Sequence, residues 1–146
     1  MLSLPKNPVA YIKRWPHLQT EEICLAALAK NINSYQYIKI QSEAIQHYIV
    51  EKAPILLWTI DRPYDSTLMI YYNDDRKFRL LQYAKYASDD FLRLCLATRR
   101  ESIRLLYKIT PVNIIMDCIK NRQDFYCEIP FPTEEMVVLY KMLWEV

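Results

Sequence analysis

The sequence predicts an all-α fold, a right- or left-handed α-solenoid of about five two-helix repeats with a half repeat at each end. Three observations support this prediction. Helix-starting residues recur at spacings of 22 or 23 residues. Two sets of apolar positions with helical spacing recur in phase with them. The chain of 146 residues contains no glycine.

Each repeat begins with a residue that favours a helix N-terminus. Thr, Ser and Asp cap helices well, and proline suits the first turn. The six starting residues are Thr20, Ser42, Asp65, Ser88, Pro111 and Thr133. Acidic residues such as Glu21 and Glu43 follow most of the starts and complement the positive end of the helix dipole. Each repeat should therefore open with a capped helix, and Thr110 is the expected cap before Pro111.

Two apolar faces follow each start. The residues three and seven positions later fall on one face of the first helix. The seventh position should be buried where helices approach, and its residues include Ala27, Ile49, Cys95 and Cys118. The two cysteines are interpreted as unbridged packing groups. A second apolar pair, fifteen and eighteen positions after the start, predicts a short second helix; Leu57 and Ile60 are one example.

The chain is expected to form a single helical repeat domain over residues 1–146. The full repeats are placed near residues 20–41, 42–64, 65–87, 88–110 and 111–132. Residues 5–19 supply only a second helix and residues 133–146 only a first helix, so both ends are half repeats. One helical hairpin cannot bury its apolar faces alone, so neighbouring repeats must stack, and the terminal helix should cover the last full repeat.

Composition narrows the class of protein. Hydrophobic residues make up 52% of the chain and charged residues 25%, as in a globular domain. The absence of glycine weighs against β-rich folds and removes glycine-dependent nucleotide-binding loops. A net charge of +2 is too small to indicate nucleic-acid binding by itself. No apolar run has the length of a membrane span and no signal peptide is recognisable, so a cytoplasmic location is expected, in the host cell if the protein is viral.

Residues that could support catalysis or metal binding do not cluster in the sequence. The two histidines, His17 and His47, and the four cysteines lack the spacing of zinc ligands or redox motifs. The Asp74-Asp75 pair is followed by basic residues and is interpreted as a solvated turn rather than a metal site. We therefore predict that the chain is not an enzyme and holds no metal and no cofactor.

The first two repeats resemble a known repeat family. Residues 7–15 read NPVAYIKRW, residues 19–40 read QTEEICLAALAKNINSYQYIKI and residues 41–60 read QSEAIQHYIVEKAPILLWTI. A Thr or Ser start, acidic residues, an apolar helix with a central small residue and a late Tyr-Ile are similar to a short helical-hairpin repeat of unknown function. That family is abundant in giant DNA viruses and also occurs in protists, bacteria and bacteriophages. The resemblance implies a viral or phage origin, and it brings no catalytic residue or cofactor.

The sequence departs from that family at the turn between the two helices, where the family commonly has Asn-Gly. The matching dipeptides are Asn31-Ile32, Ala53-Pro54, Arg76-Lys77, Arg99-Arg100 and Arg122-Gln123. Asparagine tolerates the left-handed conformation, but arginine does so less readily. The sequence therefore leaves the geometry of this turn open.

Basic residues recur at the predicted ends of the first helices. Arg76, Arg99 and Arg122 lie 23 residues apart, each eleven positions after a start. Cations favour helix C-termini, which accounts for a basic bias. Three aligned arginines also fit a surface that recognises carboxylate or phosphate groups, and both interpretations stay open. The candidate partner-binding residues, named here the arginine ridge, are Arg76, Lys77, Arg79, Arg99, Arg100 and Arg122.

The favoured function is that of a non-enzymatic, protein-binding helical repeat protein. Repeat stacks present long surfaces suited to recognition, and the resemblance implies a viral or phage accessory protein that engages or inhibits a host factor. Tyrosines fall at core positions rather than among the basic residues, unlike the stacking aromatics of single-strand binders. Two alternatives remain: a nucleic-acid-binding protein that uses the arginine ridge, and a structural component of a virion. No membrane partner is expected.

Overall fold

The computed structural model describes residues 4–145, and every regular element in this range is a helix. The α-helices are α1 (Pro8–Arg14), α2 (Glu21–Lys30), α3 (Glu43–Lys52), α4 (Asp65–Tyr72), α5 (Asp89–Thr98), α6 (Ile103–Leu106), α7 (Val112–Asn121) and α8 (Glu134–Trp144). The 3-10 helices are η1 (Pro16–Leu18), η2 (Ile32–Tyr37), η3 (Pro54–Thr59), η4 (Phe78–Tyr83), η5 (Arg100–Ser102), η6 (Tyr107–Ile109) and η7 (Gln123–Glu128). The predicted all-α class is confirmed.

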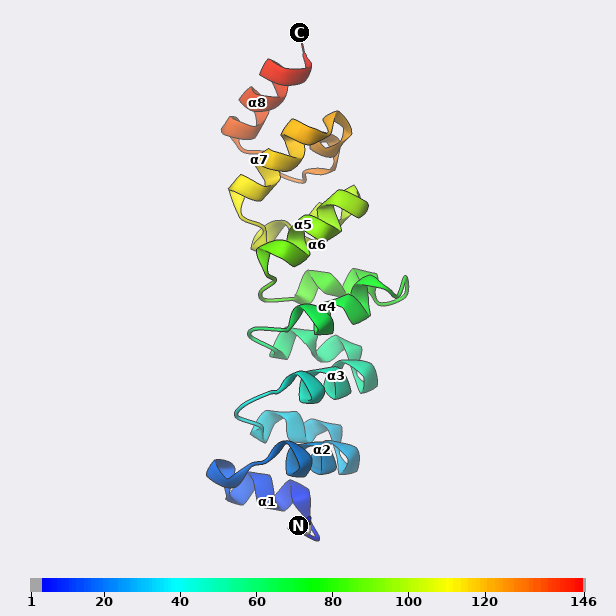
Figure 1. Ribbon diagram of the computed structural model, residues 1–146, viewed down its shortest axis with the longest axis vertical. Helices are drawn as coiled ribbons and strands as arrows, with labels where there is room; N and C mark the ends of the chain where they lie inside the picture. Colours follow the sequence, from blue (N-terminus) through cyan, green and yellow to red (C-terminus); the bar gives the residue numbers. More distant parts are fainter. Residues whose placement is uncertain (1–3, 146) are drawn as a thin grey trace.

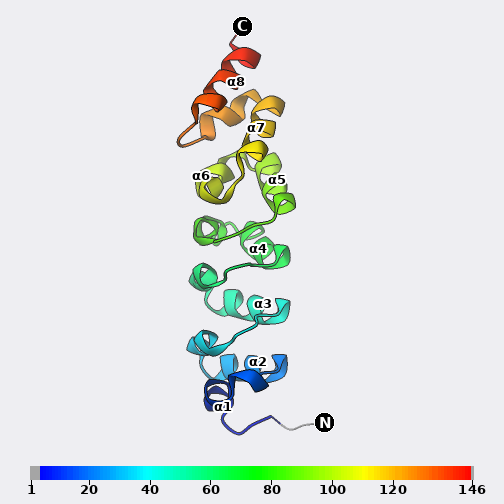
Figure 2. The same cartoon turned by 90° about the vertical axis from the view of Figure 1, so that its left-hand side faces the viewer.

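The molecule is elongated, and its helices follow one another along the long axis in chain order (Figure 1). We use "unit" for a longer α-helix together with the short helical segment that follows it, from α2 with η2 to α7 with η7. Turned by 90°, the lower units show their long helices in one column and their short segments in a second column beside it (Figure 2). The two ends of the chain lie at opposite ends of the molecule.

The six longer helices begin within one residue of the predicted starts, and side chains cap four of them. A side-chain oxygen accepts a hydrogen bond from the backbone N–H three residues later, at 3.2 or 3.3 Å, which satisfies an otherwise free donor. The capping residues are Thr20, Ser42, Ser88 and Thr133. Asp65 is the first residue of α4 rather than its cap, and Tyr64 at the N-cap position has no capping side chain.

The expected cap of α7 is wrong. The hydroxyl of Thr110 donates to the carbonyl of Leu106 at 2.6 Å, so it closes the preceding helical segment. Pro111 takes the N-cap position of α7 and has no capping side chain. A buried threonine can donate to a carbonyl of the preceding turn, and Thr110 forms this bond instead of capping α7.

In every unit except the third, one residue with a strongly negative φ angle forms the turn between the long and the short helix. This residue is extended in the first, fourth and fifth units. Asn31, Ala53, Arg99 and Arg122 have φ angles of −154°, −140°, −133° and −145°. No residue between 4 and 145 has a positive φ angle. The left-handed turn that asparagine-glycine would serve is therefore absent from this part of the chain, and no glycine is needed.

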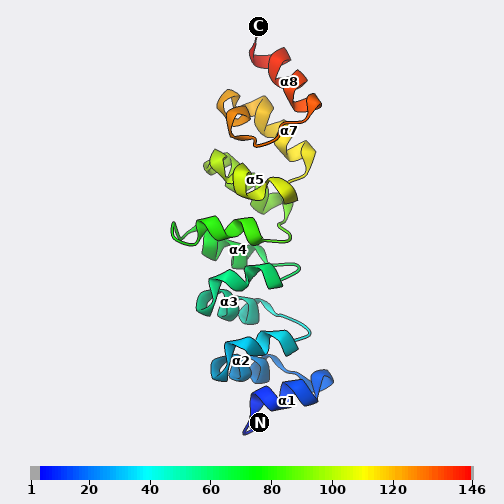
Figure 3. The same ribbon diagram turned by 180° about the vertical axis from the view of Figure 1, so that it is seen from behind.

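The third unit is different. Helix α4 ends early, at Tyr72, and residues 73–77 form a longer turn before η4. This turn, green in the figures, projects from the side of the molecule both from the front and from behind (Figures 1 and 3). Arg76 therefore does not occupy the place that Arg99 and Arg122 occupy in their units.

Most of the predicted second helices are 3-10 helices. In a 3-10 helix, side chains three residues apart eclipse one another, which suits the recurring apolar pair with a spacing of three. Leu57 and Ile60 of the second unit are both buried, and the Ile60 N–H donates to the Leu57 carbonyl at 3.1 Å. The pattern thus identifies the buried face of η3, although not its helix type. In the third unit it is wrong by one residue: Tyr83 is exposed, and Leu81 and Ala84 are buried instead.

The core extends along the molecule in two clusters of buried side chains, one from Ile12 to Ile49 and one from Val50 to Met136. Ala27, Ile49 and Cys95 are fully buried, as predicted. Cys118 is less completely buried than these three residues, because this thiol borders a surface hollow of about 210 Å³ between α5 and α7. All four cysteines are free.

Thiol labelling should follow this burial. Burial raises the pKa of Cys95 to about 12, and the positive charge of Arg99 opposes this only in part. Since the thiolate is the reactive form, Cys95 should be alkylated only when the protein unfolds. Exposed Cys127 should react first in native buffer and half-buried Cys118 more slowly. Timed alkylation followed by peptide mass spectrometry measures the order, with a fully denatured sample as control. Fast labelling of Cys95 in folded protein would contradict the assigned face of α5.

Candidate interaction surface

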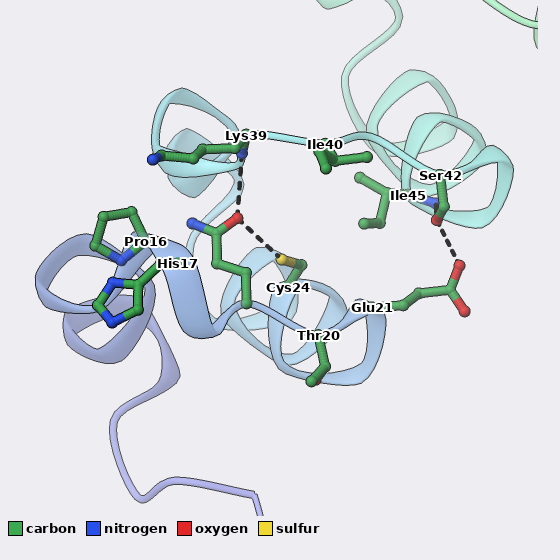
Figure 4. Close-up of a pocket in the computed structure, with 10 residues that line it drawn as sticks. Pro16, His17, Thr20, Glu21, Cys24, Lys39, Ile40, Ser42 and Ile45 are labelled. Atoms are coloured by element: carbon green, nitrogen blue, oxygen red, sulfur yellow. Dashed lines mark hydrogen bonds between the residues drawn. The ribbon is translucent and has the colours of Figure 1, made fainter.

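Hydroxyl groups join the starts of successive long helices. A serine of one unit donates to a carboxylate of the unit before it, at distances of 2.5 to 2.8 Å where Ser66 and Ser88 are the donors. The three pairs are Ser42 with Glu21, shown in Figure 4, Ser66 with Glu43, and Ser88 with Asp65. Ser42 and Ser88 also cap their own helices. These serine–carboxylate pairs therefore contribute to the contact between neighbouring units.

A hollow of about 360 Å³ lies where α2, the segment before it and the start of α3 meet (Figure 4). The Gln19 amide is one of the polar groups of its lining. It donates to the Tyr37 carbonyl at 2.5 Å and to the Ile12 carbonyl at 3.3 Å, and it accepts from the Lys39 N–H at 3.1 Å. The polar groups of the amide are thus used to join the first elements of the fold, and we interpret the hollow as a packing seam.

Arg99 of the arginine ridge binds within the molecule. Its guanidinium donates to the Asp75 carboxylate of the preceding unit at 3.0 Å. It also lies 5.4 Å from the ring centre of Tyr72 and 4.6 Å from that of Phe78, within the range of cation–π attraction. Arg99 therefore fastens the end of α5 to the turn that follows α4.

Arg100 and Arg122 also bind neighbouring residues. Arg100 pairs with Asp124 and lies 3.6 Å from Glu128, both in η7 of the next unit. Arg122 donates to the Ala97 carbonyl of the preceding unit at 3.1 Å and lies 3.5 Å from Asp124. Together with Arg99, half of the six predicted binding residues form contacts between or within units.

The other three, Arg76, Lys77 and Arg79, lie in the long turn and at the start of η4, and we call them the basic turn. Arg76 and Arg79 are exposed and Lys77 is half-buried. None of the three forms an ion pair with another residue in the 4–145 range. The Arg76 N–H donates to the Asp74 carboxylate at 2.8 Å, which fixes the backbone of the turn. The arginine ridge thus has two parts: Arg99, Arg100 and Arg122, which bind other residues of the molecule and are called the stapled part, and the basic turn.

Sequence reasoning missed the acidic partners of the stapled part. Five ion pairs join residues that are 24 positions apart, one repeat length plus one. They are Lys85 with Asp61, Arg93 with Asp117, Arg99 with Asp75, Arg100 with Asp124 and Arg104 with Glu128. Opposite charges at this separation are a signal that the sequence contains.

The two histidines, considered above as catalytic or metal-binding residues, contact neighbouring side chains of the fold. The imidazole Nε2 of His47 is hydrogen-bonded to the Ser66 hydroxyl at 3.0 Å and lies 3.9 Å from the Glu43 carboxylate. His17 lines the hollow of Figure 4 and packs edge-on against Trp15. In the part of the chain that the structure describes, no three His, Cys, Asp or Glu side chains are placed to hold a metal ion. Nor is any helix of residues 4–145 long and apolar enough to cross a membrane.

Comparison with protein-family models, with curated proteins and with solved structures gives no match for this chain. The geometry of its own side chains is therefore the basis for a functional assignment.

Proposed function

We propose that the chain is a non-enzymatic α-solenoid of about five two-helix repeats and that it binds a protein partner through the basic turn. The chain-order arrangement of the units and the side-chain bonds between neighbouring units support the solenoid. From the resemblance of the first two repeats, we extend the proposal to a viral or phage accessory protein that engages or inhibits a host factor.

The division of the arginine ridge is the observation that favours this function. The stapled arginines already face carboxylates, whereas the basic turn presents its cations on a turn with an ordered backbone. Binding residues often lie on such turns, held by a rigid scaffold. The planar guanidinium groups of Arg76 and Arg79 suit the paired oxygens of carboxylates.

The small size of the free basic surface favours a protein over a nucleic acid. Nucleic-acid binding draws its affinity from many phosphate contacts along a continuous positive surface. Here the ridge is interrupted, because Asp75, Asp124 and Glu128 neutralise its stapled part. An acidic patch on a protein matches a single basic turn better.

Removal of the free charges should weaken binding without loss of stability. The triple variant Arg76→Gln, Lys77→Gln, Arg79→Gln should keep the wild-type melting temperature, because these side chains form no ion pair with residues of the 4–145 range. Its affinity for the protein recovered by affinity purification should fall roughly tenfold, and the affinity should depend less on salt. Binding is measured at two ionic strengths, after nuclease treatment of the sample.

The matched control removes the same number of charges from the stapled part. The variant Arg99→Gln, Arg100→Gln, Arg122→Gln should lose about 1–2 kcal/mol of stability, since partly exposed ion pairs each contribute little. It should lose less affinity than the basic-turn variant. An equal loss in both variants would mean that net charge rather than the basic turn governs binding. Loss of all binding after nuclease treatment would instead indicate a nucleic-acid ligand.

A further inference from the structure

The first and last α-helices of the described residues, α1 and α8, correspond to different halves of a unit. Helix α1 lies in the column of short second helices, below η2 (Figure 2), and no long helix precedes it within the described residues. Helix α8 is a long first helix, and no short segment follows it before residue 145. An α8 helix from one copy and an α1 helix from another would together make a complete unit.

Helix α8 has an apolar face that residues 4–145 leave uncovered. On its inner side, Met136 is fully buried and the Trp144 indole donates to the Ile119 carbonyl at 3.0 Å. On the other side, Val138, Met142 and Leu143 are 50%, 71% and 43% exposed. A helix that caps a repeat stack normally turns a polar face outward. This face resembles an internal one.

Two hollows lie along α8. One of about 470 Å³ is lined by apolar Val138 and Met142 and by the acidic Glu134 and Glu135. The other, also about 470 Å³, lies between η7 and α8 beside Tyr140. In the full units, a short segment packs against its own long helix, and η4 and η7 also pack against the short segment of the preceding unit. The second hollow has room for a helical segment beside both α8 and η7.

The charges of the two ends are opposite. Residues 4–20 contain the basic Lys6, Lys13 and Arg14 and no acidic residue. Residues 123–145 contain five acidic residues and one lysine. Asp124 and Glu128 pair with arginines of the same chain, so the acidic surface of this end consists of Glu134, Glu135 and Glu145. The N-terminal end also exposes apolar side chains, with Leu4, Trp15 and Leu18 at 51%, 41% and 49%. A basic, apolar end thus matches an acidic, apolar end.

The topology places these charges at matching positions. The end of α1 and the start of α8 lie along the same edge of the molecule (Figures 1 and 3). Lys13 and Arg14 form the last turn of α1, and Glu134 and Glu135 form the first turn of α8. Within a hairpin, the end of the second helix lies beside the start of the first. The joined unit would therefore bring two cations beside two carboxylates.

We propose that copies of this chain associate head to tail, with α1 of one copy docked on α8 and η7 of the next. The contact joins two different surfaces, so it leaves one free end of each kind and forms open chains of copies rather than a closed dimer. This interface is separate from the basic turn, and either proposal can fail without the other.

Two end-specific variants test the proposal. Lys13→Glu with Arg14→Glu blocks the N-terminal end, and Val138→Glu with Met142→Glu blocks the C-terminal end. Light scattering coupled to size-exclusion chromatography should show that the wild-type mass rises with concentration through dimers to longer chains. Each variant alone should remain a monomer. An equimolar mixture should give dimers and nothing larger, because only one intact pair of ends is present.

The control is Leu94→Glu, which places a similar charge at an exposed leucine on α5, away from both ends, and should associate like the wild type. Circular dichroism establishes that every variant is folded. A wild type that remains monomeric at all concentrations would overturn the proposal. So would a folded end variant that dimerises alone, since that would reveal contact between like ends, and so would a mixture that stays monomeric.

Discussion

Replacement of Tyr71 by alanine should lower the free energy of unfolding by about 3–5 kcal/mol, the range for loss of a large buried side chain. The side chain of Tyr71 on α4 is fully buried. Its hydroxyl also donates to the Pro54 carbonyl of the preceding unit at 2.6 Å, so the substitution removes both core packing and a contact between units. Denaturant unfolding followed by circular dichroism measures the effect.

Two further variants separate the causes. Tyr71→Phe keeps the ring and loses the hydrogen bond, which should cost about 1–2 kcal/mol. Tyr83→Ala removes the same kind of side chain from an exposed position on η4 and should change stability by less than about 0.5 kcal/mol. Equal effects of Tyr71→Ala and Tyr83→Ala would show that the assigned core is wrong.

The environment of Tyr71 also predicts a pH dependence. Burial raises the pKa of Tyr71 above that of an exposed tyrosine, because the charged phenolate is poorly solvated in the core. The unfolded chain therefore loses this proton first as the pH rises. The contribution of neutral Tyr71 to the free energy of unfolding is fully present below the tyrosine pKa of the unfolded chain. It is lost as the pH increases toward the pKa of Tyr71 in the folded protein. Tyr71→Phe should remove this part of the alkaline sensitivity.

Deletion of residues 133–146 should cause aggregation or a broader, less cooperative unfolding transition. Helix α8 covers the last full unit with Met136 and with the bond from Trp144 to the Ile119 carbonyl. Without α8, part of the apolar face of α7 becomes accessible to water, and uncovered ends of repeat stacks associate nonspecifically. Static light scattering and thermal melting measure both outcomes.

A variant that keeps α8 but makes its outer face polar is the matched control. Val138→Ser with Met142→Ser should remain soluble and melt cooperatively, because both side chains are at least half exposed. A soluble deletion with an unchanged melting transition would contradict the capping role of α8.

The sequence predicted the starts of the long helices well because the signals are local. A capping oxygen and its backbone partner are three residues apart, as at Ser42 and Ile45, so a sequence window of one turn contains both. The 3-10 character of the short segments was not predicted, because an apolar pair such as Leu57 and Ile60 fits both helix types. The predicted cap at Thr110 was wrong for a similar reason, since a threonine hydroxyl can bond to residues after it or before it in the chain.

The predicted site was harder because its contacts cross between units. Arg76, Arg99 and Arg122 are equivalent by sequence spacing, but the early end of α4 displaces Arg76 from the common position. The pairing of Arg99 with Asp75 depends on how one unit sits against the next, and this geometry cannot be obtained from a repeat pattern alone. Spacing therefore predicted a row of cations and not which of them are free.

The single turn residue between the long and short helices can vary in residue type without a change in backbone geometry. Every L-amino acid other than proline reaches such backbone angles without strain, so the backbone of this position places no demand on residue type. Asn31, Ala53, Arg99 and Arg122 occupy it with similar backbone geometry and different charge. One substitution there can change the charge along this side of the molecule, one unit at a time, while the backbone path of the turn is retained.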